Sequence, residues 1–307
     1  MIDFLIRVHK ESIWLPQLLR SIERQEGGYV RNILILDNNS EDKPKEIINQ
    51  FPNLKIIYSE YKKYYLPGEM LNYSINILVK RNSKENNLND DYVCIVSAHC
   101  FFDNNCSLQK FFNHLKKISN CRSGFGRQVP MIISDAQAIR DLVLLYPMES
   151  RIIKKAPAFN NAYSLIRYDV LEENLFNNET TNLEDVIWAD NELKKGYKIA
   201  YCAESEIVHF HGPHHSNSYS RLEKTKKTIE NNSKVFNINL RKANIISDEV
   251  ISIFAGYELN DTLINEAKKQ ISNRKIILWT SKNYKNFFNK KQIENIIWIK
   301  KKSIGRF

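Results

Sequence analysis

Short apolar runs alternate with amphipathic stretches along the first sixty residues. Continuous apolar runs of strand length are typical of parallel strands, and apolar positions three or four residues apart are typical of helices that pack on a sheet. The pattern predicts strands at residues 2–8, 32–36 and 55–58, with one helix capped by Ser12 and another after Pro44. The first helix is expected to bury Ile13, Leu15, Leu18, Leu19 and Ile22. This alternation predicts an α/β domain with ligands beyond the carboxyl ends of its strands.

The pattern continues with a Pro67-Gly68 turn before a helix that contains Asn72, a central strand at residues 92–96, and a composite segment over residues 161–211. That segment reads as a polar loop, an acidic pair, a helix, a glycine turn at Gly196, a strand and a histidine cluster. No glycine-rich dinucleotide motif follows any of the strands, so a dinucleotide cofactor is not expected.

The carboxyl-terminal part repeats the strand–helix alternation on a smaller scale. Strands are predicted at residues 250–254, 275–279 and 296–299, with helices at 259–271 and 284–293 between them. We therefore expect three parts: a catalytic domain over residues 1–215, a basic helical linker over 216–247, and a small βαβαβ appendage over 248–307.

The predicted parts differ in net charge. The chain of 307 residues has a formal net charge of +10, and residues 216–307 carry 19 lysines and arginines against 8 acidic residues. A basic tail fits a phosphate-rich partner or an anionic membrane surface, and equally a solvated face. We expect no nucleic-acid partner.

The cysteine content and the hydropathy pattern indicate the cellular compartment in which the protein is expected. There are five cysteines and no Cys-x-x-Cys pair, which favours reduced structural thiols in the cytoplasm. Polar residues interrupt the amino-terminal apolar run, so it is not typical of a signal peptide, and no stretch approaches the 18 apolar residues of a membrane span.

The acidic pair Glu184-Asp185 precedes a helical apolar pattern and has two interpretations. Acidic residues in a first helical turn interact favourably with the helix dipole, so the pair is explained as a helix start. Alternatively, one carboxylate points into a cleft and acts as a general base while the other anchors the loop.

The residue pattern of this region resembles that of a known family. Asn161-Ala162-x-Ser164-x-x-Arg167, followed by Glu184-Asp185-x-x-Trp188-Ala189, is similar to the second half of a glycosyltransferase family 2 domain, which has the GT-A fold. The resemblance covers about residues 1–215. It implies an inverting sugar transfer with Asp185 as catalytic base and Glu184 as its partner or alternative.

The amino-terminal half resembles the same family. Glu11 follows the first strand, and Asp37-Asn38-Asn39 stands where relatives carry an Asp-Asp-x-Ser motif. The resemblance implies that Glu11, Asp37 and Asn39 bind the nucleotide and that Asn72 packs beside it. The alternatives are an Asx turn for Asp37, an exposed first-turn acid for Glu11 and a purely structural Asn72.

The metal-binding motif departs from the family pattern. Ser97-Ala98-His99 replaces the usual Asp-x-Asp, which holds Mg²⁺ or Mn²⁺ against the donor diphosphate. Ser97 is a weak substitute, and His99 is interpreted either as a metal or diphosphate contact or as a plain loop histidine. Imidazole suits Mn²⁺ better than Mg²⁺. A second metal contact is expected from His211 or His209.

Two further residues follow a short strand. Arg127 and Gln128 lie in a Gly-Arg-Gln sequence that many relatives share. They are expected to reach the donor or the acceptor, where an arginine would stabilise leaving-group charge. The alternative for Arg127 is a structural salt bridge.

The sequence therefore predicts an inverting hexosyltransferase that uses a UDP-, dTDP- or GDP-linked sugar and a saccharide or lipid-linked acceptor. The resemblance places it in bacterial surface polysaccharide or capsule synthesis, in the cytoplasm or peripherally at the inner face of the membrane. The rival predictions are a degenerate GT-A scaffold, motivated by the missing Asp-x-Asp, and a sugar nucleotidyltransferase, which would need a glycine-rich phosphate loop.

Overall fold

The computed structural model forms two compact units, Met1–Phe236 and Asn237–Phe307. The structure describes residues 1–38, 40–61, 66–82, 88–131, 134, 139, 142–143, 145–154, 159–180, 183–210, 250–254, 275–280, 289, 294 and 296–300. Asn39, His211, the predicted basic linker over residues 216–247 and the two predicted helices of the tail lie outside these described residues.

The first unit is built on a nine-stranded sheet with the order β3-β2-β1-β4-β8-β6-β9-β5, and β7 pairs with β9. The strands are β1 (Ile2–Val8), β2 (Val30–Asp37), β3 (Ile56–Glu60), β4 (Tyr92–Ser97), β5 (Cys100–Phe101), β6 (Cys121–Pro130), β7 (Arg151–Ile152), β8 (Tyr163–Arg167) and β9 (Lys198–His209). Parallel pairing joins β3, β2, β1 and β4, and also joins β6 and β9. Because β8 runs antiparallel to both β4 and β6, those six strands all run in one direction.

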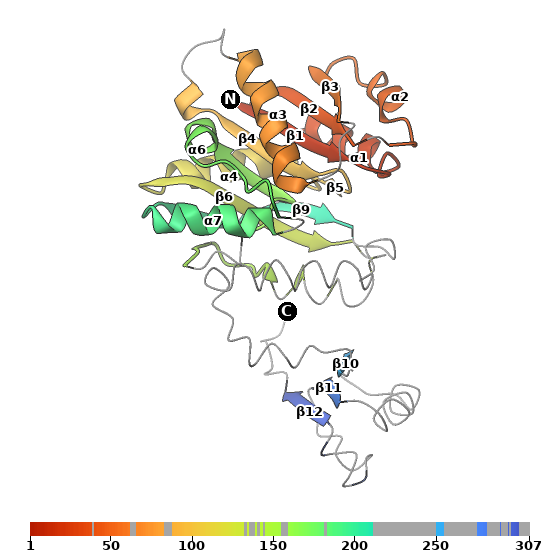
Figure 1. Cartoon of the computed structure of the whole chain (residues 1–307). Helices are drawn as coiled ribbons and strands as arrows, with labels where there is room; N and C mark the ends of the chain where they lie inside the picture. Colours follow the sequence, from red (N-terminus) through yellow and green to blue (C-terminus); the bar gives the residue numbers. More distant parts are fainter. Residues whose placement is uncertain are drawn as a thin grey trace. The chain divides into compact units, whose positions relative to one another are not determined.

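Helices cover both faces of the sheet (Figure 1). They are α1 (Leu15–Glu23), α2 (Pro44–Ile48), α3 (Pro67–Asn82), η1 (Leu88–Asp90), α4 (Ser107–Lys116), α6 (Tyr168–Glu173) and α7 (Glu184–Lys194). Side chains of α1, α2 and α4 pack with Phe4 and Ile6 on one face. Side chains of α3, α6 and α7 pack with Leu5 on the other. Alternate residues of one buried strand thus supply two cores, which explains its continuous apolar run.

The start of the first helix differs from the prediction. Helix α1 begins at Leu15 with Trp14 as its N-cap, and Pro16 lies in its first turn, where the ring is tolerated. Ser12 therefore does not cap it, and the Ser12 amide instead donates to Asp42 Oδ2 over 2.7 Å. Ile13 precedes the helix and is 81% exposed, so it is not part of the apolar face.

The described part of the second unit is a three-stranded parallel sheet of order β10-β11-β12. Its strands are β10 (Val250–Phe254), β11 (Lys275–Thr280) and β12 (Ile296–Lys300), within one residue of the predicted positions. Among the described residues of the whole chain, no helix is both long and apolar enough to cross a membrane.

Candidate active site

Residues far apart in the sequence meet at one edge of the large sheet. Since six strands run the same way, their carboxyl ends lie on the same edge, where ligands of α/β sheets bind. Glu11 follows β1, His99 follows β4, Gln128 lies near the end of β6 and His209 is the last residue of β9. The sheet therefore brings four of the chemically interesting side chains to one place.

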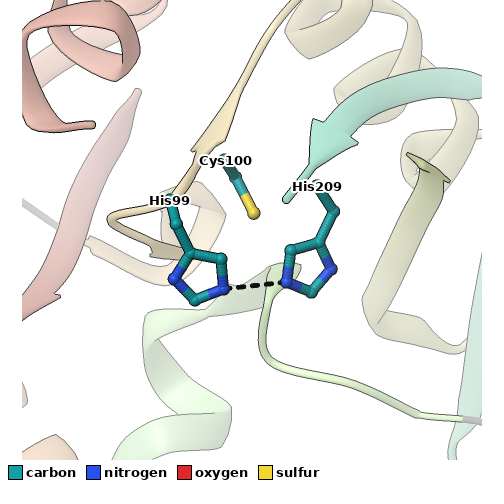
Figure 2. A group of neighbouring side chains, drawn as sticks. All are labelled: His99, Cys100 and His209. Carbon is teal, nitrogen blue, oxygen red and sulfur yellow. Dashed lines mark hydrogen bonds between the residues drawn. The ribbon is translucent and has the colours of Figure 1, made fainter. Parts of the chain in front are cut away.

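Two histidines form the centre of this site. The Nε2 atoms of His99 and His209 lie 2.9 Å apart, and their rings stack with centroids 4.9 Å apart and an interplanar angle of 25°. Figure 2 shows the two imidazoles facing each other beside the Cys100 thiol. All three residues are buried, and their potential ligand atoms lie within 4.8 Å of one another.

The outer nitrogen of each imidazole has its own partner. His99 Nδ1 lies 2.8 Å from Glu11 Oε1, and His209 Nδ1 lies 2.6 Å from Gln128 Oε1. Gln128 Nε2 in turn donates to Asn160 Oδ1 over 3.2 Å. Both rings are thus held by oxygen atoms on the side away from the contact between them.

The acidic pair Glu184-Asp185 opens helix α7. Asp185 is half-buried, and its Oδ2 accepts a hydrogen bond from the Asn161 amide over 3.1 Å while Oδ1 accepts one from the Val186 amide over 2.8 Å. Removal from water, and then the charge of Glu184, raises the pKa of Asp185 to about 7. Glu184 is buried and lies 3.9 Å from the Arg7 guanidinium. One member of the pair is therefore neutralised by an arginine and the other is poised to exchange a proton near neutral pH.

The backbone is strained immediately before this pair. Leu183, the N-cap of α7, has φ +61° and ψ +22°, a left-handed conformation that a γ-branched side chain rarely adopts. Such outliers persist only where their surroundings hold them, and they are frequent at functional sites. The strain turns the chain so that the two carboxylates enter the first helical turn.

The donor atoms around His99 fit a transition-metal cation better than Mg²⁺. Two imidazole nitrogens and a sulfur are intermediate to soft ligands, which suit Zn²⁺ or Fe²⁺. Mn²⁺ prefers oxygen ligands but accepts imidazole more readily than Mg²⁺ does. Burial, and then the charge of Glu11, raises the pKa of the Cys100 thiol, so this sulfur is a weak ligand. The two imidazoles are the principal ligands that the chain could offer.

Part of the chain matches a family model. Residues 3–121, which run from β1 to the start of β6, match the model of glycosyl transferase family 2. This part of the chain is therefore similar to glycosyltransferase family 2 domains. The fold is the GT-A fold of such glycosyltransferases. It has four neighbouring parallel strands in one half of the sheet, and the candidate site lies at the carboxyl ends of its strands.

Two curated relatives of this chain come from Salmonella. The O-antigen chain rhamnosyltransferase WbaN of Salmonella anatum is 26% identical over 189 residues, which cover 58% of this chain and 56% of the relative. The O-antigen chain rhamnosyltransferase RfbN of Salmonella typhimurium strain LT2 is 23% identical over 213 residues, covering 65% and 63%. The similarity therefore spans about six-tenths of either relative's length.

Solved structures share the fold. Residues 1–349 of S. aureus TarS superpose with a TM-score of 0.53 at 12% identity, covering 89% of this chain and 80% of that one. GalNAc-T7 with UDP, GalNAc and Mn²⁺ superposes with a TM-score of 0.51 at 10% identity, covering 69% and 44%. At such identities the likeness establishes the GT-A fold and nothing more specific.

Two predicted nucleotide-binding residues already have hydrogen-bond partners within the protein. Asp37 accepts hydrogen bonds from the Ser40 amide over 2.8 Å and from the Tyr58 hydroxyl over 2.6 Å. The first of these bonds runs from residue 37 to residue 40, one residue further than the Asx turn that the sequence left open. Asn72 donates to Phe176 O over 2.8 Å and accepts from Phe176 N over 3.0 Å, so it ties the loop after α6 to α3. A contact of Asp37 or Asn72 with a nucleotide remains a prediction.

Arg127 and Ser97 lie at the same edge of the sheet. Arg127 pairs with Glu206, which stands opposite it on β9, so the structural alternative for this arginine is realised. Ser97 ends β4, and its amide donates to Ala162 O over 3.2 Å. Contacts of either residue with a donor or an acceptor also remain predictions.

Sequence patterns did not single out three residues of the site. Cys100 is the residue after His99 and pairs with His209 across β5 and β9. Tyr146 hydrogen-bonds the Gln128 side chain and lies near enough to Asp185 for that charge to raise the Tyr146 pKa, after burial. Asn160 holds Gln128. Of the two adjacent asparagines before β8, the family motif includes Asn161 but not Asn160.

Proposed function

We propose that this chain is an inverting glycosyltransferase that moves a sugar from a nucleoside diphosphate donor to a saccharide or lipid-linked acceptor. The observation that carries the proposal is the Asp185 carboxylate, which is half-buried, held by two amides and has a pKa raised to about 7. A base with this pKa accepts a proton efficiently at neutral pH.

The reaction follows from one base and one displacement. Asp185 takes the proton of the acceptor hydroxyl while that oxygen attacks the anomeric carbon from the face opposite the diphosphate. The new carbon–oxygen bond forms as the bond to the diphosphate oxygen breaks, so the anomeric configuration inverts and the nucleoside diphosphate leaves. Among the described residues, each Asp185 oxygen accepts one amide hydrogen bond, which leaves it a lone pair for the acceptor.

Glu184 supports the base. Its negative charge adds to burial in raising the pKa of Asp185, and its own charge is compensated by Arg7 at 3.9 Å. Glu184 thereby keeps its neighbour basic without itself competing for the acceptor proton.

His99 and His209 would hold a divalent cation, with Mn²⁺ preferred over Mg²⁺. When bound, such an ion neutralises charge on the diphosphate leaving group. His99 stands where most relatives have the last aspartate of Asp-x-Asp, and the convergence of its Nε2 on that of His209 supports the exchange of a carboxylate for an imidazole pair. In this proposal Glu11 orients His99, since Glu11 Oε1 lies 2.8 Å from Nδ1.

The substrates are proposed from the relatives. Both Salmonella relatives are named O-antigen chain rhamnosyltransferases, which favours a rhamnosyl or related deoxyhexosyl donor carried on dTDP, with UDP and GDP as the alternatives. The acceptor would be a growing surface glycan on a lipid carrier. That acceptor puts the enzyme in the cytoplasm at the inner membrane face, where the basic residues of 216–307 attract anionic lipid.

A donor panel tests this function. The purified chain is incubated with dTDP-rhamnose, UDP-glucose or GDP-mannose, with Mn²⁺ or EDTA, and free nucleoside diphosphate is measured with and without membrane extract as acceptor source. We expect one donor to be consumed in an acceptor-dependent, Mn²⁺-stimulated reaction. Consumption of none of the donors, together with no thermal stabilisation by dTDP, UDP or GDP, would contradict the proposal.

A further inference from the structure

The orientation of the Gln128 amide is fixed by its neighbours. Asn160 Oδ1 accepts a hydrogen bond from the Ala162 amide over 2.7 Å, so this atom is an oxygen and an acceptor. The Gln128 atom 3.2 Å from it must then be the donor, Nε2. Gln128 therefore presents Oε1 to His209 Nδ1 at 2.6 Å, and because an amide oxygen only accepts, Nδ1 must carry the proton.

The same reasoning applies to His99. Its Nδ1 lies 2.8 Å from Glu11 Oε1, and an ionised carboxylate only accepts, so this Nδ1 also carries the proton. In neutral imidazoles both Nε2 atoms then present lone pairs. The two Nε2 atoms lie 2.9 Å apart, so either a shared proton or a metal ion joins them, and the Gln128 contact at Nδ1 leaves the His209 Nε2 lone pair available to it.

We propose that Gln128, held by Asn160, is a positioning residue that fixes the His209 tautomer so that His99 and His209 offer two lone pairs to one metal ion. The inference rests on the cation site of the proposed function and adds the residues that prepare it. Oxygen partners on the outer nitrogens of metal-binding histidines fix ring orientation and raise ligand basicity.

The two histidines differ in the partner that holds them. His99 faces a carboxylate, which strengthens the imidazole as a ligand, whereas His209 faces a neutral amide. His209 is therefore the weaker ligand of the two, and its affinity depends on a group that can be replaced without touching either histidine. An apolar side chain of similar length at position 128 should therefore weaken the site.

Metal binding measured by itself tests the role of Gln128. Mn²⁺ is titrated into the full chain without nucleotide, by calorimetry or by the loss of the free Mn²⁺ resonance in electron paramagnetic spectra. We expect Gln128→Met to raise the Mn²⁺ dissociation constant about 10- to 100-fold. Gln17→Met, on the exposed side of α1, is the matched control and should bind as wild type.

A second pair of variants tests the positioning role even if Gln128→Met fails to fold. Asn160→Ala removes one of the two side chains that hold the Gln128 amide, the other being Tyr146, and should weaken Mn²⁺ binding less than Gln128→Met but in the same direction. Asn160→Asp keeps an acceptor for Gln128 Nε2 and should bind like wild type. Wild-type affinity in both Gln128→Met and Asn160→Ala would overturn the positioning role while leaving the cation site intact. Absence of Mn²⁺ binding by the wild-type chain would instead overturn the cation site itself.

Discussion

His99 and His209 stand 110 positions apart in the sequence, yet their Nε2 atoms lie 2.9 Å from each other. His99 lies between β4 and β5 and His209 ends β9, and because β5 pairs with β9 the two residues meet at the same edge of the sheet. In the proposed function this pair takes the place of the carboxylates that most family 2 glycosyltransferases use for a metal ion, and the proposal predicts how the chain responds to metals.

Removal of one imidazole should abolish the response to Mn²⁺. We expect His209→Ala to lose about 100-fold of the Mn²⁺-stimulated transfer rate, because one remaining nitrogen cannot hold the ion against water. His114→Ala, on α4 outside the site, is the control. The measurement is the transfer rate across a Mn²⁺ titration, and equal stimulation of His209→Ala and wild type would refute the assignment.

The pH dependence of transfer should report the acidic pair. Asp185 acts only when ionised, so kcat/KM should rise with pH and level off above an apparent pKa of about 7. Glu184→Gln removes a like charge and should move this midpoint to lower pH. The check is a pair of pH profiles from 5 to 9 on one donor. An unchanged midpoint in Glu184→Gln would show that the two carboxylates are not coupled.

Stability should also depend on Asp185. Its folded-state pKa of about 7 lies above the usual aspartate value of about 3.9, so the folded state binds the proton more tightly and stability falls as pH rises between these values. Asp185→Asn removes this dependence. We expect the Tm difference, variant minus wild type, to be more positive at pH 8 than at pH 5. A difference independent of pH would mean that the carboxylate is not perturbed.

Asn72 should matter for stability. Its side chain satisfies both the amide and the carbonyl of Phe176 in a buried position, and Asn72→Ala would leave those groups unpaired. The expected loss is about 2–3 kcal/mol of unfolding free energy, measured by urea denaturation. Asn76→Ala, one turn further along α3 and exposed, should change stability by less than about 0.5 kcal/mol. A direct nucleotide contact by Asn72 would appear instead as weaker nucleotide binding at unchanged stability.

Much of the fold was accessible from the sequence because its strands are continuous apolar runs and its helices have one apolar face. The first helix shows the limit of that approach. Ser12 is a favoured capping residue, but Pro16 fits only in a first turn, so the helix starts at Leu15 and Ile13 stays exposed. Capping preference and proline position competed, and the sequence alone did not show which would decide.

The site was predictable where chemistry is local and unpredictable where it depends on strand register. Glu184 and Asp185 lie together in the chain, so their pairing could be foreseen. Arg127 could not be distinguished from a substrate-binding arginine, because its partner Glu206 is set by the register of β6 with β9. The histidine cluster after β9 indicated a metal contact, but which histidine faces His99 depends on where that strand ends.

The most direct test of the account separates binding from chemistry in Asp185→Asn. Affinity for the nucleoside diphosphate with Mn²⁺ is measured by calorimetry, and the rate and anomeric configuration of transfer are followed by proton NMR. We predict nucleotide affinity within about twofold of wild type, transfer reduced at least about 100-fold, and an inverted anomer from the wild-type enzyme. Wild-type transfer rates in Asp185→Asn, or a retained anomer, would contradict the assignment of Asp185 as the base of a single displacement.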